Sequence, residues 1–105
     1  MPQRDEDWWL SSLEQDILTL LLGRELYGLE MIEAMKTVGE KVSYPLVVGA
    51  GSLYPKLKEM EEGGLIVSQR RTAQRKYYSV TELGRRILNE TRVRRQRLAN
   101  YKPEV

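Results

Sequence analysis

The sequence contains neither cysteine nor histidine among its 105 residues. Without cysteine, the fold does not depend on disulfides or on thiol chemistry. Without either residue, a zinc site and the usual histidine- or cysteine-based catalytic arrangements are not expected. Carboxylates alone could still act as acids or bases or hold magnesium. We therefore expect a protein that is not an enzyme and that has no metal site and no cofactor.

Long apolar runs are missing as well. The longest spans residues 17–22, is interrupted by Thr19, and falls far short of the roughly eighteen residues that a membrane helix needs. The acidic residues 1–7 lack the pattern of a secretory signal. These absences predict a cytoplasmic protein that does not associate with membranes.

The charges are distributed unevenly, although the net charge is only +2. Residues 1–62 carry 6 Lys/Arg and 12 Asp/Glu, whereas residues 63–105 carry 11 Lys/Arg and 3 Asp/Glu. A polyanion would therefore be attracted to the C-terminal part of the chain and repelled by much of the rest. The alternative interpretation is that charged helix faces simply keep the protein soluble.

Apolar residues at helical spacing predict four helices. We expect them over residues 12–22, 27–38, 52–62 and 82–100, with Gly49 as an alternative start for the third. Ser11 with Glu14, and alternatively Ser12 with Gln15, fits a capping box, and Thr81 is placed to cap the last helix. Two apolar stripes are expected in the core: Leu29, Met31, Ile32 and Met35 in the second helix, and Leu53, Leu57 and Met60 in the third.

A hairpin is predicted between the third and fourth helices. Residues 65–69 and 76–80 are rich in β-branched and aromatic residues, which favours strands. Residues 70–75 between them are polar and basic and would form the tip. A further short strand is predicted at residues 46–48.

Three helices followed by a two-stranded hairpin is the element order of a winged helix-turn-helix. The predicted fold class is therefore mainly α with a small β-hairpin wing, and a C-terminal helix for dimerisation follows. An α-helix fits the major groove of DNA, so the third helix is the candidate recognition element. Its polar side offers four candidate DNA contacts, which are Ser52, Tyr54, Lys56 and Lys58.

The wing supplies four more candidate contacts, which are Arg70, Arg71, Arg75 and Lys76. Like charges in a short hairpin repel one another, so stability does not explain them. Contact with the phosphate backbone or the minor groove does. A merely solvated, highly soluble turn is the alternative.

The second half of the last helix has too few apolar residues to pack on a core of its own. Val93 and Leu98, together with Ile87, are therefore candidates for a dimer interface. Trp8 and Trp9 are candidates for the same interface, although they could instead pack on the domain's own core or line a ligand cleft. On this basis we divide the chain into a DNA-binding domain at residues 1–81 and a dimerisation helix at residues 82–105.

Three segments resemble known sequence motifs. Residues 51–66 are similar to the recognition-helix signature of PadR-type transcriptional regulators. Residues 75–84 are similar to the wing of that family, and residues 26–32 to the start of its second helix. The resemblance covers about residues 13–88. Tyr27 and Leu29 depart from the residues that are common there, a histidine and an aromatic residue.

This resemblance implies a winged-helix homodimer that binds a palindromic operator in double-stranded DNA, usually as a repressor. It leaves open whether a small-molecule effector exists. The main alternative is a winged-helix module that binds an acidic protein partner through Arg92, Arg94, Arg95 and Arg97. A basic wing combined with a basic third helix favours DNA, because a protein-binding module does not need both.

Overall fold

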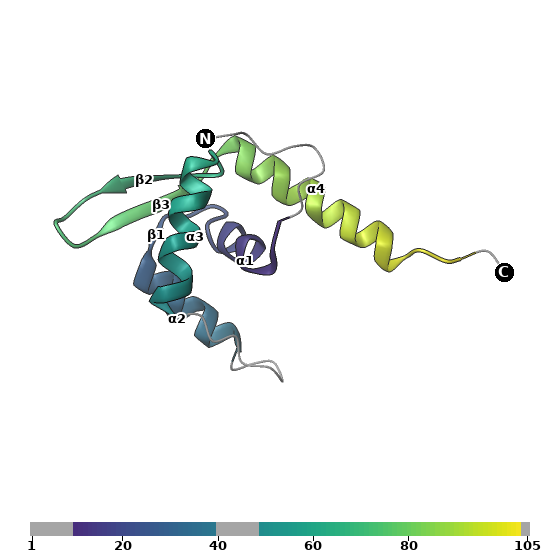
Figure 1. The fold of residues 1–105 in the computed structure, drawn as a ribbon, viewed down its shortest axis with the longest axis horizontal. Helices are drawn as coiled ribbons and strands as arrows, with labels where there is room; N and C mark the ends of the chain where they lie inside the picture. Colours follow the sequence, from purple (N-terminus) through teal and green to yellow (C-terminus); the bar gives the residue numbers. More distant parts are fainter. Residues whose placement is uncertain (1–9, 40–48, 104–105) are drawn as a thin grey trace.

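The computed structural model describes residues 10–39 and 49–103. Within these ranges the order is α1 (Ser12–Leu20), β1 (Leu26–Tyr27), α2 (Gly28–Gly39), α3 (Ala50–Glu62), β2 (Ile66–Arg70), β3 (Lys76–Val80) and α4 (Glu82–Ala99). The β2–β3 hairpin projects from one side of the molecule and the second half of α4 from the other (Figure 1). The predicted mainly α winged helix-turn-helix fold is confirmed, and no helix of the described residues is long and apolar enough to cross a membrane.

Two predicted helix caps form as expected. The Ser11 hydroxyl accepts the Glu14 N–H at 3.2 Å, and the Glu14 carboxylate accepts the Ser11 N–H at 2.8 Å. The Thr81 hydroxyl accepts the Gly84 N–H at 3.0 Å and donates to the Gly64 carbonyl at 2.7 Å. The second pair of bonds ties the start of α4 to the turn between α3 and the wing.

The core lies between the helices and one face of the sheet. Its fully buried members come from every helix and from the wing, and they include Leu10, Ile17, Leu18, Leu21, Met31, Leu53, Leu57, Met60, Leu65, Ile66 and Leu88. The predicted stripe of α3 is therefore confirmed. In α2 the two methionines are buried, but Leu29 is 60% exposed, so its assignment to the core was wrong. Leu29 lies only two residues before Met31, on nearly the opposite side of the helix.

The sheet has a third strand that the sequence did not indicate. β1 pairs antiparallel with β3 and gives the order β1-β3-β2, with Tyr27 opposite Tyr77. Tyr27 thus belongs to a strand rather than to the first turn of α2, where it was expected. A two-residue strand carries no periodicity by which it could be recognised.

The third helix begins at Ala50, close to the alternative start at Gly49 rather than at Ser52. Gly49 is its N-cap, and the Leu53 N–H donates to the Gly49 carbonyl at 3.0 Å. Pro55 consequently lies inside the helix, where it cannot donate to the Gly51 carbonyl, and one hydrogen bond is lost. The predicted strand at residues 46–48 lies outside the described residues.

Gly84 allows α4 to pack directly on the base of the wing. A methyl group at this position would overlap the Leu65 carbonyl oxygen and come within 2.8 Å of Val80 Cγ2. Overpacking of this kind costs up to about 3 kcal/mol, and Gly84→Ala gains roughly 1 kcal/mol of helix propensity. We therefore expect a net destabilisation of up to about 2 kcal/mol.

Urea unfolding monitored by circular dichroism measures this effect. Gly51→Ala is the matched control, since Gly51 also lies in a helix but has no neighbouring atom within 4 Å of the place that an added methyl group would take. This control should be neutral or slightly stabilising. If the Gly84→Ala protein is as stable as wild type, α4 and the base of the wing can move apart at little cost in free energy.

Candidate nucleic-acid interface

The four predicted contacts of α3 lie on two flanks of the helix. Residues four apart share a face, whereas residues two apart point in nearly opposite directions. Ser52 and Lys56 therefore lie on one flank, and Tyr54 and Lys58 lie on the other. Ser52, Tyr54 and Lys58 are exposed. The four residues border the exposed strip of the helix rather than forming one row along it.

The Lys56 flank is partly neutralised within the helix. Lys56 Nζ lies 3.1 Å from the Glu59 carboxylate, and the Lys56 side chain is only 25% exposed. A neighbouring phosphate would have to compete with this carboxylate. Lys58, for which no such ion pair is found among the described residues, is the more available cation.

Tyr54 joins α3 to the start of α2. Its ring lies directly over Gly28, so closely that a methyl group built on Gly28 would come within 2.6 Å of two ring carbons. Tyr54 is nevertheless 42% exposed. Tyr54 thus fixes the angle between the two helices and also offers a side chain to the surface. The structural role of Gly28 could not be inferred from sequence spacing.

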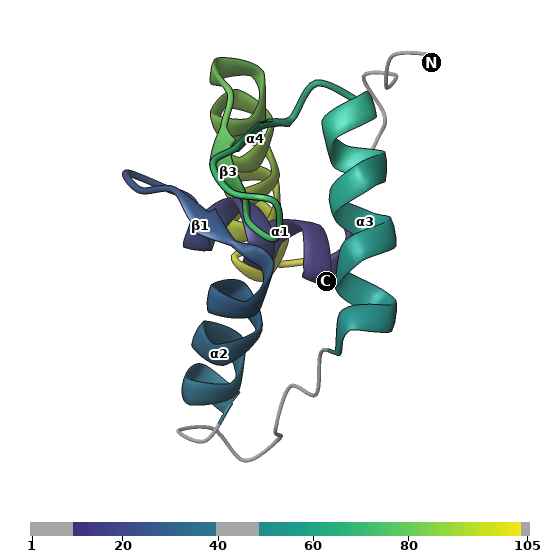
Figure 2. The ribbon, with the colours of Figure 1, turned by 90° about the vertical axis from the view of Figure 1, so that its left-hand side faces the viewer.

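The inner face of the wing is tied to the last turn of α3. The Ser68 hydroxyl donates to the Glu61 carboxylate, and Lys76 Nζ lies 3.6 Å from the same group. Lys76 also lies 5.9 Å from the centre of the Tyr78 ring. Burial raises the pKa of the Tyr78 phenol, and the negative charge of Glu61 raises it further, so the phenol stays protonated. These contacts fix the wing beside α3 (Figure 2).

The outer face of the wing carries two adjacent aromatic rings with an arginine at each end. The Arg71 guanidinium lies 4.6 Å from the centre of the Tyr77 ring, and the Arg75 guanidinium lies 4.6 Å from that of Tyr27. The two rings meet edge to face at 5.3 Å. Arg71 Nη2 also lies 2.6 Å from the Glu25 carboxylate, in the segment before β1. β1 therefore helps to position the wing cations.

Hydrogen bonds within the tip hold the wing turn in one conformation. The Thr72 hydroxyl accepts the N–H groups of Gln74 and Arg75, at 3.2 and 3.0 Å. The Arg70 guanidinium donates to the Ala73 carbonyl at 3.0 Å. The structure thus brings together all four predicted wing cations on one hairpin, where Arg70, Arg71 and Arg75 are exposed and Lys76 is partly buried.

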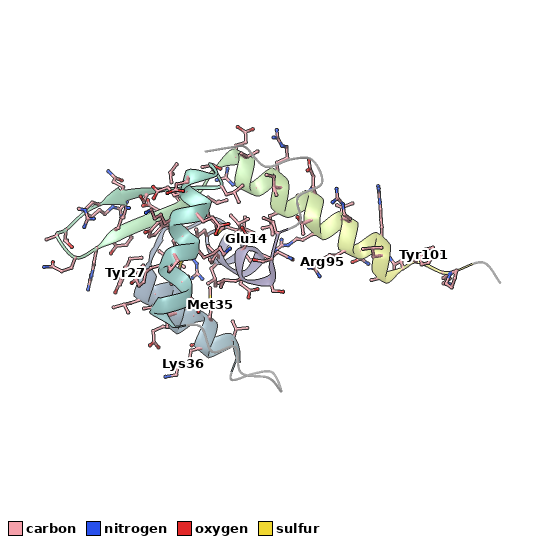
Figure 3. All side chains as sticks on the ribbon, in the orientation of Figure 1. Glu14, Tyr27, Met35, Lys36, Arg95 and Tyr101 are labelled. Carbon is pink, nitrogen blue, oxygen red and sulfur yellow. The ribbon has the colours of Figure 1, made fainter. Side chains whose placement is uncertain are left out.

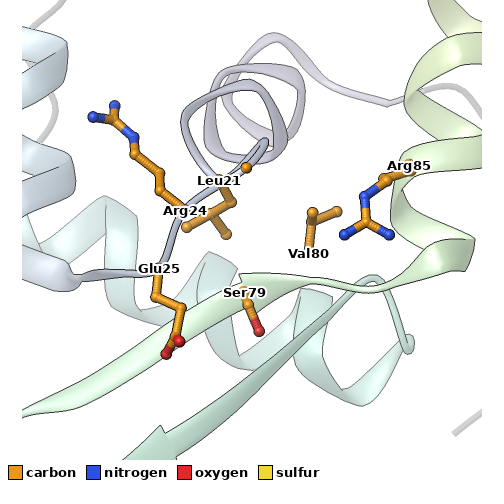
Figure 4. Close-up of a pocket in the computed structure, with 7 residues that line it drawn as sticks. Leu21, Arg24, Glu25, Ser79, Val80 and Arg85 are labelled. Carbon is orange, nitrogen blue, oxygen red and sulfur yellow. The ribbon is translucent and has the colours of Figure 1, made fainter.

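A shallow pocket of about 270 Å³ opens between the end of α1, β3 and the start of α4. Its lining includes Arg24, Glu25, Ser79 and Arg85 (Figure 4). The Arg24 guanidinium points away from the pocket and donates to the Leu20 carbonyl at 2.8 Å. The charged side chains that line the pocket do not converge on one point, so we assign no small-molecule effector to this pocket. Among the described residues, no group of three or more acidic side chains could hold a metal ion.

The candidate dimer residues of α4 lie on different sides of the helix. Ile87 and Leu98 are eleven residues apart and share a face, whereas Val93 lies about 140° from Leu98 at 100° per residue. Ile87 packs partly on the core, while Leu98 is 62% and Val93 42% exposed. Beyond the helix, Tyr101 is 69% exposed, far from the wing (Figure 3). Trp8 and Trp9 lie outside the described residues.

Comparison with known proteins gives a consistent result. The profile of the family described as "Transcriptional regulator PadR-like family" matches residues 17–90. The fold is similar to that of a PadR family regulator from Eggerthella lenta, with 27% identity, a TM-score of 0.72 and coverage of 85% of this chain and 76% of that one. It is also similar to one from Clostridium difficile, with 26% identity, a TM-score of 0.69 and coverage of 85% and 92%.

A third solved structure shares the fold. Bacillus subtilis PadR, crystallised in complex with operator DNA, is 23% identical with a TM-score of 0.65. The alignment covers 91% of this chain and 51% of that one. No curated protein is significantly similar to the chain.

Proposed function

This chain belongs to the PadR-like family of transcriptional regulators, and we propose that it is a repressor that binds a palindromic operator as a homodimer. In this proposal residues 1–81 bind double-stranded DNA and residues 82–105 join the two protomers. The protein acts in the cytoplasm, where its operator is.

The observation that carries the proposal is the arrangement of the wing beside α3. The hairpin presents Arg70, Arg71, Arg75 and Lys76, and the inner-face contacts hold it next to the exposed side of α3. Cations on a wing neutralise phosphates and supply affinity for any duplex. A helix beside them reaches base edges in the major groove. Ser52, Tyr54 and Lys58 are the α3 side chains that we assign to this contact, with Lys56 contributing after it leaves Glu59.

A coiled-coil type of seam along α4 supports the dimer. Positions 87, 91, 94 and 98 of α4 alternate in steps of four and three, the spacing of residues that face a partner helix. Position 94 is an arginine, and Tyr101 follows just beyond the end of the helix. The first two positions of the seam are occupied by Ile87 and the buried Thr91, which pack on this protomer. Leu98 and Tyr101 are exposed. A second copy of α4 would cover these two side chains.

Dimerisation would place two copies of α3 in successive major grooves. In helix-turn-helix dimers the half-sites lie about one helical turn apart, roughly 34 Å, and the symmetry of the protein is mirrored in the operator. Occupancy of the operator then blocks the polymerase or another factor. This geometry is our basis for proposing a palindromic site and repression.

Fluorescence anisotropy with promoter-derived and random duplexes tests the proposal. We expect tighter binding to a subset of promoters and a steep loss of affinity with salt. Each neutralised phosphate contributes about −0.9 to the log–log slope, so a dimer whose wings each make at least two such contacts should show a slope of about −3.6 or steeper.

The negative outcome of this titration is equally informative. If no duplex is bound at low salt, the DNA-binding proposal is rejected. The arginines of α4 would then direct the search to an acidic protein partner. Binding with no preference among promoters would support DNA binding but contradict the recognition of a specific operator.

A further inference from the structure

The Glu25 carboxylate binds one edge of the Arg71 guanidinium, a group that is expected to contact DNA. Its carboxylate Oε2 lies 2.6 Å from Arg71 Nη2, although the two residues are 46 positions apart in sequence. The side chains are 43% and 44% exposed, so both remain accessible from the surface. A short N⁺–H···O⁻ bond of this kind is a charge-assisted contact.

The aromatic contact on the other side limits how Arg71 can respond. Its guanidinium lies 4.6 Å from the centre of the Tyr77 ring, so the ring covers one face of the group. An anion must therefore approach along the edge, which is also the geometry in which guanidinium groups bind carboxylates and phosphates. The Glu25 carboxylate already lies at this edge, where it accepts a hydrogen bond from Arg71 Nη2.

Arg75 provides a contrast within the same wing. It lies over the Tyr27 ring at a similar distance of 4.6 Å. Among residues 10–39 and 49–103, however, no ion pair to Arg75 is found. Arg75 can thus bind a phosphate directly, whereas Glu25 already binds Nη2 of Arg71.

We propose that Glu25 is an internal competitor of DNA for Arg71, and that it sets the overall affinity of the regulator without changing its sequence preference. The inference rests on the DNA-binding function proposed above. Each binding event exchanges the Glu25 carboxylate for a phosphate oxygen at the same guanidinium edge. Because phosphate contacts carry no base information, the competition lowers affinity for operator and random duplex alike. Glu25 thereby limits sequestration of the protein on random DNA.

The test compares wild type with Glu25→Gln, Arg71→Ala and the double variant, on one promoter duplex and one random duplex. An exposed ion pair contributes little, so we expect Glu25→Gln to bind both duplexes only about two- to fivefold more tightly. Its log–log salt slope should be steeper by up to about 0.9 per protomer. In the Arg71→Ala background, Glu25→Gln should change affinity much less, because the competition has been removed.

Glu90→Gln on α4 is the charge-matched control, since it removes one exposed carboxylate away from the wing. It should bind both duplexes as wild type does. If wild type binds DNA and Glu25→Gln behaves like this control, or if the gain persists in full without Arg71, the competition does not exist. If wild type binds no duplex, the proposed function itself fails, and the competition fails with it.

Discussion

Replacing Leu98 by arginine is expected to convert the proposed dimer into monomers. It should also weaken binding to the proposed palindromic operator by about 100-fold or more, because two linked half-sites bind far better than one. Leu98 is the most exposed apolar residue of α4, at 62%. In a symmetric pair of α4 helices, Leu98 of one protomer would contact Leu98 of the other protomer or a residue close to it. Two new guanidinium groups would then face each other beside the arginines already present on α4.

Sedimentation velocity over a range of protein concentrations measures the dimer without DNA. Val93→Arg is the matched control, because Val93 is also exposed on α4 but lies about 140° around the helix at 100° per residue. We expect this control to remain dimeric. The added positive charge alone would tighten DNA binding. Weaker operator binding by Leu98→Arg would therefore result from loss of the dimer. A dimeric Leu98→Arg protein beside a monomeric Val93→Arg protein would move the interface to the Val93 face.

Local physical rules explain why much of this fold could be predicted from the sequence. The Ser11–Glu14 capping box and the Thr81 cap need only residues three positions apart. The core positions of α3 follow from helical spacing, and the wing from strand-forming runs on either side of a basic turn. In each case the signal and the structure lie within one short segment of the chain.

Features that depend on distant contacts could not be predicted in this way. β1 is a strand only because β3 pairs with it, and Tyr54 lies over Gly28 only because α3 crosses the start of α2. The Glu25–Arg71 pair joins a loop before β1 to the wing tip. The sequence therefore indicated which cations gather in the wing. It did not indicate that Arg71 and Lys76 are already bound to carboxylates of this chain.

The paired replacement of Arg71 and Arg75 by alanine is expected to weaken DNA binding by about 100-fold near 0.1 M salt, because a dimer then loses four phosphate contacts. The log–log salt slope should become shallower by between about 0.9 and 1.8 per protomer, because Glu25 already offsets part of the Arg71 contribution. Operator and random duplexes should be affected alike, since these contacts do not read bases.

The stability of the fold should change little in this variant. It removes one exposed ion pair and two arginine–tyrosine contacts, and exposed contacts of these kinds contribute about 1 kcal/mol or less each. Urea unfolding checks this, and Arg95→Ala with Lys102→Ala is the charge-matched control, since both lie at the end of the chain away from the wing. A control that binds as weakly as the wing variant would mean that total charge, rather than the wing, determines affinity. Unchanged affinity after loss of Arg71 and Arg75 would refute the assignment of the wing to DNA.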